Sequence, residues 1–227
     1  MPIIMEKGGQ STTEPQVIAK TPRWLVLLKP AGWLTIPGRT SAGATSAPVL
    51  FDWAKEQHDA VWTVHRLDRE TSGVVLFART AEDHRTANTW FQEHQIKKSY
   101  DLLASGALGA PLLKIQAPIE ESPAMTQVEL KENFAHAGCF RARATPTTGR
   151  RHQIRIHLAS RRHPLLGDKK YGGAMKLGLP DGELSVGRVA LHASRLELPT
   201  REAFEAPWPD DFSGWVEALR KKGGSDA

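Results

Sequence analysis

Hydrophobic and polar residues fall into short segments along the chain, and their pattern predicts strands more often than helices. Mostly apolar runs at residues 24–28, 61–64 and 73–78 are typical of buried strands. Further strands are predicted at residues 98–104, 112–115, 127–134, 139–144 and 189–198. Because strands mostly follow strands, the pattern predicts an α+β fold with a mixed, mostly antiparallel central sheet and flanking helices.

Four segments have helical patterns instead. Ser46 is placed to begin a helix that ends near residue 54. Thr80, with Asp83 three residues later, resembles a capping box, and apolar residues at helical spacing follow it. Residues 150–162 fit a helix or a strand by pattern, and their length favours a helix. A last helix is predicted at residues 212–221.

The two ends of the chain differ from the part between them. Residues 1–20 are polar and lack periodicity, so a flexible N-terminal arm is expected there, with a flexible C-terminal tail at 222–227. The 227 residues are 40% hydrophobic, which is enough for a sizeable core. A single domain is therefore expected over residues 21–221.

Several classes of protein are disfavoured by composition. No apolar run approaches the roughly 20 residues that span a bilayer. The opening MPIIMEKGGQSTTEPQ lacks the apolar region of a secretory signal. Cys139 is the only cysteine, which precludes an intrachain disulfide and a CxxC metal site. We therefore expect a soluble, cytoplasmic protein without a metal or a membrane partner.

Positive charge is concentrated in one part of the chain. Lys and Arg exceed Asp and Glu by 30 to 25, a net charge of +5. Residues 141–170 hold nine basic residues and one acid, Asp168, hence +8, which leaves −3 for the remainder. Such a segment suggests a polyanionic partner, with RNA or DNA first. The alternative is an ordinary solvated face, and charge alone does not separate the two.

The loop HRLD, His65–Asp68, is the first candidate for chemistry. It places charged groups beside two apolar runs, which is costly unless the charges are paired or used. Gly73 allows another chain segment or a ligand to come close. An aspartate here could instead only cap a turn. HRLD also occurs in the kinase catalytic loop, but no Gly-rich phosphate loop or DFG accompanies it.

The second candidate is TGRRHQIRIHL at residues 148–158, the centre of the basic segment. Its two histidines are five residues apart, a poor spacing for one metal on a helix, and HQIRIH is not HExxH. The segment is therefore either a basic surface helix or the source of an arginine that partners a carboxylate elsewhere.

These residues resemble the RluA-type pseudouridine synthases. HRLDRETSGVVLFA matches that family's signature, HRLD followed by two variable residues and TSG. The resemblance extends, in the family's order from about residue 27 to residue 199, to LLKPAGWLTIPG, IKKSYDLL, TGRRHQIRIHLASRRHPLLGDKKYG and ALHASRLELP. It implies the pseudouridine synthase fold with a catalytic cleft, and isomerisation of selected uridines in structured RNA without a cofactor.

The resemblance also implies roles for single residues. Asp68 would be the catalytic carboxylate, which attacks C1′ or C6 or removes the 2′ proton, and the sequence does not choose among these routes. Tyr100 would stack on the uracil and assist proton transfer at C5. Arg155 would pair with Asp68 and stabilise its charge, and Arg66 would fill the gap left by the flipped base. His65 would orient the loop.

Other residues would contact the substrate or bound the cleft by the same resemblance: Thr71, Lys29, Arg150, His152 and Gln153. Many relatives carry an N-terminal S4-type RNA-binding domain, which about twenty polar residues are too few to form. Target choice is then expected from residues 141–170, with tRNA or rRNA as partner and a monomer as the active form. The rival interpretations are a non-catalytic RNA-binding module and a nucleoside glycosidase that uses Asp68.

Overall fold

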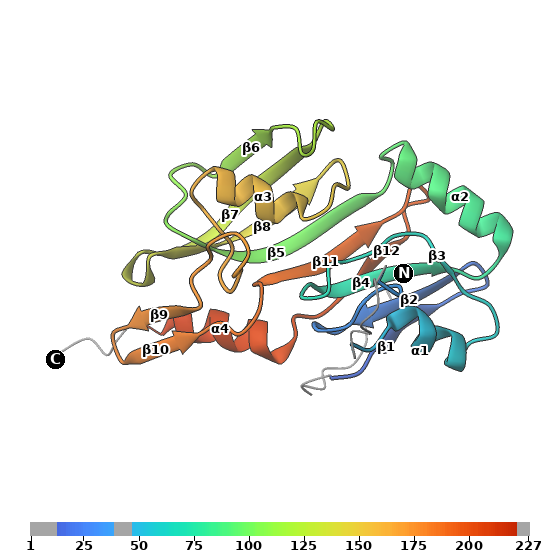
Figure 1. Cartoon of the computed structure of the whole chain (residues 1–227), viewed down its shortest axis with the longest axis horizontal. Helices are drawn as coiled ribbons and strands as arrows, with labels where there is room; N and C mark the ends of the chain where they lie inside the picture. The colour runs from blue at the N-terminus through green and yellow to red at the C-terminus, as the bar shows by residue number, and fades with distance from the viewer. Residues whose placement is uncertain (1–12, 39–46, 222–227) are drawn as a thin grey trace. The chain divides into compact units, whose positions relative to one another are not determined.

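The computed structural model describes residues 13–38 and 47–221, which divide into two compact units (Figure 1). The first unit takes the chain up to Lys97 and then Ala193–Pro207, and the second takes Lys98–His192 and the chain from Trp208 onward. The chain passes from one unit to the other inside β5 (Lys97–Ser105) and inside β11 (Leu191–Glu197). Each unit has its own sheet region and helices.

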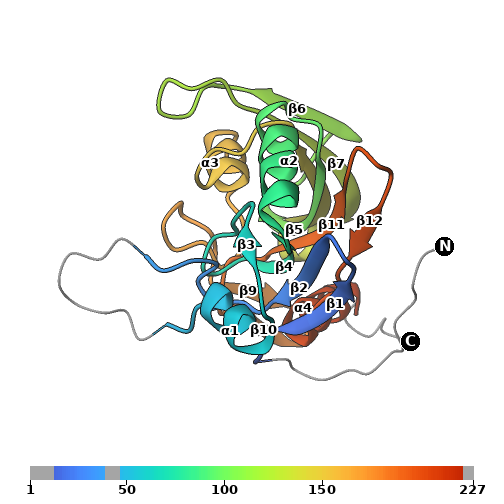
Figure 2. The same ribbon diagram turned by 90° about the vertical axis from the view of Figure 1, so that its right-hand side faces the viewer.

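The first unit is built on two buried antiparallel strands. β2 (Trp24–Lys29) pairs with β4 (Ser72–Ala78), and no residue of either strand is exposed. The strand order is β1-β2-β4-β11, with β3 and β12 attached to β4 and β11 (Figure 2). The remaining elements of this unit are β1 (Gln16–Lys20), β3 (Trp62–Thr63), β12 (Ala203–Glu205), α1 (Leu50–Gln57) and α2 (Ala81–Gln92).

Gly73 is the position in β4 where the chain comes closest to itself. Its φ is +125°, and a Cβ there would lie 2.2 Å from the carbonyl oxygen of Ala193 in β11. The close approach expected at this glycine is therefore made by the chain's own backbone. A side chain at residue 73 would separate two strands of the first unit.

The second unit has helices on both faces of an antiparallel sheet ordered β5-β8-β7-β6. Successive residues of β5 point to opposite faces, so Leu102 packs into one apolar cluster with Leu158 of α3, while Leu103 packs into another with Phe212 of α4. The elements are β6 (Leu112–Gln116), β7 (Met125–Phe134), β8 (Cys139–Pro146), α3 (Gln153–Ser160), α4 (Asp210–Arg220), a 3-10 turn at Ala135–Ala137, and the hairpin of β9 (Lys176–Leu179) and β10 (Gly182–Ser185).

The α+β fold with mostly antiparallel pairing is confirmed, and so is the helix within residues 150–162. The flexible arm expected up to residue 20 is wrong for Gln16–Lys20, which pair with β2 as β1. Residues 172–187, for which the sequence predicted no strand or helix, contain the β9–β10 hairpin. α1 begins after Val49 without a side-chain cap, and the expected start, Ser46, lies outside the described residues.

The remaining expectations about the chain ends and domains stay predictions. Residues 1–12 and 222–227 lie outside the described part of the chain, and the single domain expected over 21–221 is likewise untested. Over residues 13–38 and 47–221, none of the helices has both the length and the apolar character needed to cross a membrane.

Candidate active site

The HRLD loop is held in the first unit by backbone contacts on both sides of Asp68. The buried hydroxyl of Thr35 accepts a hydrogen bond from the Leu67 N–H and donates one to the Leu67 carbonyl, each at 3.1 Å. The N–H of Thr71 donates to the Asp68 carbonyl at 3.1 Å, which closes a turn after the carboxylate. Within this frame Asp68 is half-buried and Arg66 is exposed, while Thr71 is buried.

His65 anchors the beginning of the same loop. Its Nε2 accepts a hydrogen bond from the Leu76 N–H of β4 at 2.9 Å, and its ring stacks on Phe91 of α2 with centroids 5.0 Å apart. The imidazole therefore ties the loop to a strand and to a helix. This is the geometry of an orienting residue, and a contact of His65 with substrate stays a prediction.

Lys29 lies at the end of β2 with its side chain fully buried. The Nζ donates to the carbonyl oxygens of Pro30, Trp33 and Arg69 at 2.9, 2.8 and 3.1 Å. An ammonium has three protons to donate, and here three carbonyls receive them. Lys29 thus joins the loop after β2 to the residue after Asp68, and its predicted place at a cleft or a phosphate stays a prediction.

Gln153, at the start of α3 in the second unit, is also turned inward. Its buried amide makes four hydrogen bonds, accepting from the Thr148 hydroxyl (2.7 Å) and the Arg150 N–H (3.0 Å) and donating to the Met125 carbonyl (2.9 Å) and the Thr126 hydroxyl (3.1 Å). These use the full donor and acceptor capacity of one amide. Gln153 fastens the loop before α3 to β7, and its predicted contact with substrate stays a prediction.

Arg155 of α3 is buried and forms a fork with the buried carboxylate of Asp168. Its Nε lies 2.7 Å from Oδ2 and its Nη2 lies 2.8 Å from Oδ1. The guanidinium also lies 5.2 Å from the ring centroid of Tyr171. The sequence indicated a carboxylate partner for Arg155, and within the second unit that partner is Asp168. A pairing of Arg155 with Asp68, which belongs to the first unit, stays a prediction.

Tyr100 and Lys98 lie two residues apart in β5, so their side chains leave the same face of the strand. Tyr100 is half-buried and packs against the apolar cluster that contains Leu102. The Nζ of Lys98 donates to the Thr148 carbonyl at 3.2 Å, and burial lowers the pKa of this ammonium below its usual value. Lys98 was not among the residues predicted for the site, although its two-residue spacing from Tyr100 in the strand was a signal for it.

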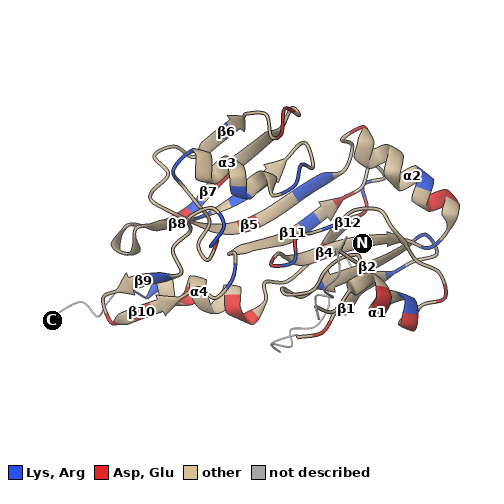
Figure 3. Ribbon diagram, viewed as in Figure 1, with Lys and Arg blue, Asp and Glu red and all other residues tan. Residues whose placement is uncertain are grey.

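The basic segment separates into paired and exposed cations. Arg141 pairs with Glu132, Arg143 with the buried Asp101, and Arg155 with Asp168. The remaining six are exposed, and the part of the chain that the structure describes offers none of them an ion pair. We call them the α3 cations (Figure 3): Arg150, Arg151, Arg161, Arg162, Lys169 and Lys170.

The α3 cations flank the helix in sequence, and four of the six lie near its beginning. Arg150 and Arg151 precede it, and Arg161 and Arg162 follow it. Lys169 and Lys170 adjoin Tyr171, whose hydroxyl lies 2.9 Å from Nδ1 of His152, the residue before α3. His152 itself has φ +54°, a left-handed backbone at the start of the helix. Arg150, Arg151, Lys169 and Lys170 thus lie near the start of α3, and Arg161 and Arg162 lie at its other end.

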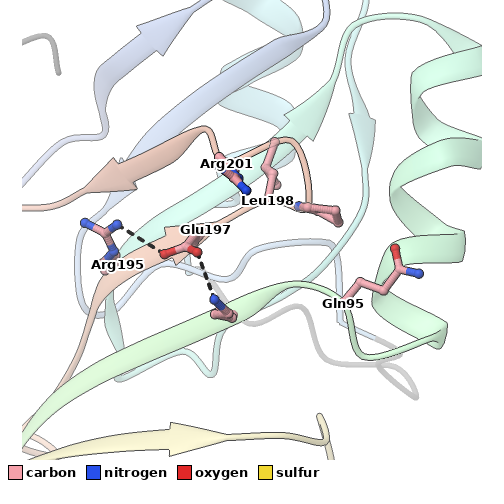
Figure 4. A pocket seen from close by; sticks show the side chains of 7 residues that line it. Gln95, Arg195, Glu197, Leu198 and Arg201 are labelled. Carbon is pink, nitrogen blue, oxygen red and sulfur yellow. Dashed lines mark hydrogen bonds and ion pairs between the residues drawn. The ribbon is translucent and has the colours of Figure 1, made fainter. Parts of the chain in front are cut away.

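A polar groove of about 420 Å³ lies elsewhere in the first unit (Figure 4). Glu197 accepts from Lys97 at 3.0 Å and from Arg195 at 3.2 Å, and these two hydrogen bonds hold the pKa of Glu197 below its usual value. Arg195 also bonds Glu205. Because no predicted site residue lines it, this groove is not the candidate active site.

Comparison with known proteins agrees with the motifs. The family described as RNA pseudouridylate synthase matches residues 23–160. A tRNA pseudouridine synthase C of Salmonella typhi is 34% identical over 77% of this chain and 76% of its own length. A ribosomal large subunit pseudouridine synthase D of Xylella fastidiosa is 32% identical over 86% of this chain, which spans 66% of that relative.

Solved structures have the same fold. Human RNA pseudouridylate synthase domain containing 4 superposes with a TM-score of 0.71 over 90% of this chain and 92% of its own, at 23% identity. Human RNA pseudouridylate synthase domain containing 1 gives 0.67 over 98% of this chain and all of its own, again at 23% identity. With the family match over more than half of its residues, the chain belongs to the RNA pseudouridylate synthases, isomerases that act on RNA.

Proposed function

We propose that this protein converts selected uridines of a structured RNA to pseudouridine, with Asp68 as the catalytic carboxylate. The observation that carries the proposal is the HRLD loop, in which Asp68 is half-buried and the backbone around it is fixed by Thr35, by the turn to Thr71 and, through the residue after it, by buried Lys29. A loop held this firmly presents one carboxylate in one position, which a reaction at a single sugar carbon requires.

The reaction rearranges bonds without adding or removing atoms. The C1′–N1 bond breaks, the uracil turns, C5 bonds to C1′, and the proton lost from C5 is balanced by one gained at N1. Asp68 serves as nucleophile at C1′ or C6, or as base at the 2′ position, and in each route its charge offsets positive charge on the sugar. No cofactor is required by this chemistry.

The other predicted residues support the same step. The half-buried ring of Tyr100 offers a surface for stacking on the uracil and a hydroxyl for proton transfer at C5. Arg155 stabilises the Asp68 carboxylate. Flipping the base from its stack costs a few kcal/mol, and exposed Arg66 fills the gap that the base leaves.

The substrate is proposed to be tRNA or rRNA, the two RNAs for which the relatives above are named. The α3 cations supply the sequence-independent attraction for the phosphates of either RNA. We further propose that the protein acts as a cytoplasmic monomer. A binding module without catalysis would need these cations but neither Asp68 nor Tyr100.

The first test maps pseudouridines in total RNA from cells with and without this protein, by carbodiimide adduct stops at single-nucleotide resolution. One or a few sites should disappear and return with the wild type but not with Asp68→Asn. An unchanged map contradicts the proposal, unless purified protein forms pseudouridine in the same RNA. Release of free uracil would instead favour a glycosidase.

Purified variants then test the role of Asp68. Asp68→Asn removes the charge and keeps the shape, so turnover should be abolished while RNA affinity stays within about threefold, because base-independent affinity comes mainly from phosphate contacts. Asp59→Asn, an exposed change in the same unit, is the matched control and should keep full turnover. Near-normal turnover of Asp68→Asn would remove it from the reaction.

A further inference from the structure

The turn after α3 holds a buried acid that no role above uses, Asp168. We infer that Asp168 is a positioning residue: it fixes the guanidinium of Arg155 in the one orientation in which this arginine serves the proposed reaction. The inference rests on the proposed function, because it adds a second residue to the machinery in which Arg155 takes part.

The first support is the geometry of the pair. Both side chains are almost completely removed from solvent, and two parallel N–H···O bonds of 2.7 and 2.8 Å join them. Such a fork fixes the plane and the direction of a guanidinium, which a single bond does not. The fork uses the Nε and Nη2 edge of Arg155, so the Nη1 end is directed away from Asp168.

The second support is that Asp168 is itself fixed by the backbone around it. Its Oδ1 accepts from the N–H groups of Lys170 and Tyr171, both at 3.2 Å. Its carbonyl accepts from the Gly173 N–H at 2.8 Å. A Cβ at Gly173 would lie 1.8 Å from the Leu165 carbonyl oxygen, so the turn closes only around glycine. The carboxylate therefore has one orientation.

The third support is the aromatic contact on the guanidinium. Tyr171 places its ring centroid 5.2 Å from the guanidinium carbon of Arg155, and its hydroxyl lies 2.9 Å from Nδ1 of His152. Asp168 thus binds one edge of the Arg155 guanidinium, and the ring of Tyr171 lies against the same guanidinium. The turn that carries both residues closes back on the start of α3, which is where Arg155 originates.

The second unit contains a matched pair for the control. Asp101 is also buried, and it accepts from Arg143 Nε at 3.0 Å, from Arg143 Nη2 at 3.4 Å and from the Trp208 indole N–H at 2.8 Å. Breaking either pair leaves a cation without its carboxylate. Only the Asp168 pair contains an arginine that the proposed reaction uses.

The kinetic test compares Asp168→Asn with Asp101→Asn on an RNA that the wild type modifies. We expect kcat to fall on the order of 10²-fold for Asp168→Asn, the effect of misplacing a catalytic group by about 1 Å, with KM within about threefold. Asp101→Asn should keep kcat within about threefold. Equal losses in the two variants, or a normal kcat for Asp168→Asn, would overturn the inference.

A double-mutant cycle tests whether Asp168 acts through Arg155. If it does, adding Asp168→Asn to Arg155→Ala should change kcat by less than about twofold, because the arginine to be positioned is gone. Multiplying losses would overturn the inference, and so would a normal kcat for Arg155→Ala. Should Asp168→Asn not fold, Asp168→Glu keeps the charge, shifts the fork by one methylene and carries the same expectations.

A spectroscopic readout separates failure of the inference from failure of the proposed function. The Nε–H resonance of Arg155 is identified by its loss in Arg155→Lys. In Asp168→Asn this resonance should shift and exchange faster with water, and an unchanged resonance would overturn the inference. If the wild type forms no pseudouridine, the proposed function fails, and this resonance still reports whether Asp168 holds Arg155.

Discussion

Two buried polar side chains in this protein are hydrogen-bonded to several groups of the loops and strands around them. Lys29 donates to three carbonyls, and the Gln153 amide joins a loop to a strand through four hydrogen bonds. Replacing such a group leaves its partners buried and unsatisfied, at about 1–3 kcal/mol for each. Gln153→Ala should therefore lower the free energy of unfolding measured in urea by more than that amount, and an unchanged value would contradict the network.

Cys139 packs in the core as an apolar residue does. It is 1% exposed in the cluster that contains Phe212, and burial raises the pKa of its thiol from 9.0 to about 12. The thiolate is the reactive form, so the native protein should react with a maleimide far more slowly than the same protein in guanidinium. Equal rates in the two states would contradict the burial of this thiol.

The same thiol makes the stability depend on pH. Its pKa is higher in the folded state than in the unfolded chain, so the folded state keeps the proton longer. The contribution is fully present below about pH 9 and is lost as the pH rises toward about 12. Cys139→Ser lacks this titration, so the difference between the two unfolding free energies should change in that window alone.

Lys29 and Gln153 point inward, and the sequence motifs did not predict this orientation. The motifs single out Asp68 and Arg155, of which the first is half-buried and the second buried. The direction of a polar side chain depends on which loops, distant in sequence, lie beside it. The carbonyl of Arg69 accepts from Lys29, and the carbonyl of Met125 accepts from Gln153. No local pattern contains that information.

At the level of elements, α2 depends on its first turn. Thr80 accepts from the Asp83 N–H at 3.0 Å and donates to the Asp83 carboxylate at 2.7 Å. Thr80→Ala should lower the free energy of unfolding by about 1 kcal/mol, because an N–H at the helix end loses its partner. Thr89→Ala, in the exposed middle of the helix, should leave stability equal or higher. Equal effects of the two changes would contradict the cap.

Strands and helices with a clear apolar pattern were predicted, whereas β1 and the β9–β10 hairpin were not. β2, β4 and α2 follow uninterrupted apolar runs or helical spacing, which are strong local signals. β1 is polar at both ends and becomes a strand only because β2 offers it a partner. The β9–β10 hairpin is four residues a side and mostly exposed. In both cases pairing, not pattern, decides the structure.

At the scale of the molecule, the net charge of +5 understates the charge available to RNA. Carboxylates neutralise three of the nine basic residues between Arg141 and Lys170, and the six α3 cations remain. Single-stranded contacts give a slope of about −0.7 in log–log salt plots per phosphate, so about four contacts predict a slope of roughly −3. A flat salt dependence of RNA binding would exclude these cations from the interface.

A double substitution assigns the slope to this surface. Arg161→Ala with Arg162→Ala removes two α3 cations, so the slope should become shallower by about 1.4 if each contacts a phosphate. Lys55→Ala, an exposed change in α1, is the control and should leave the slope unchanged. An equal change of slope in both variants would indicate a general effect of net charge rather than binding of RNA by the α3 cations.

The contact of Gly73 with Ala193 has a consequence for synthesis on the ribosome. β4 and β11 are neighbours in the first unit, yet more than a hundred residues separate them in the chain. The nascent chain therefore exposes one edge of β4 while Lys98–His192 emerges, and β11 covers that edge only afterwards. Because chains are made from the N-terminus, synthesis of the first unit starts before that of the second. The first unit nevertheless lacks Ala193–Pro207 until Lys98–His192 of the second unit has been made.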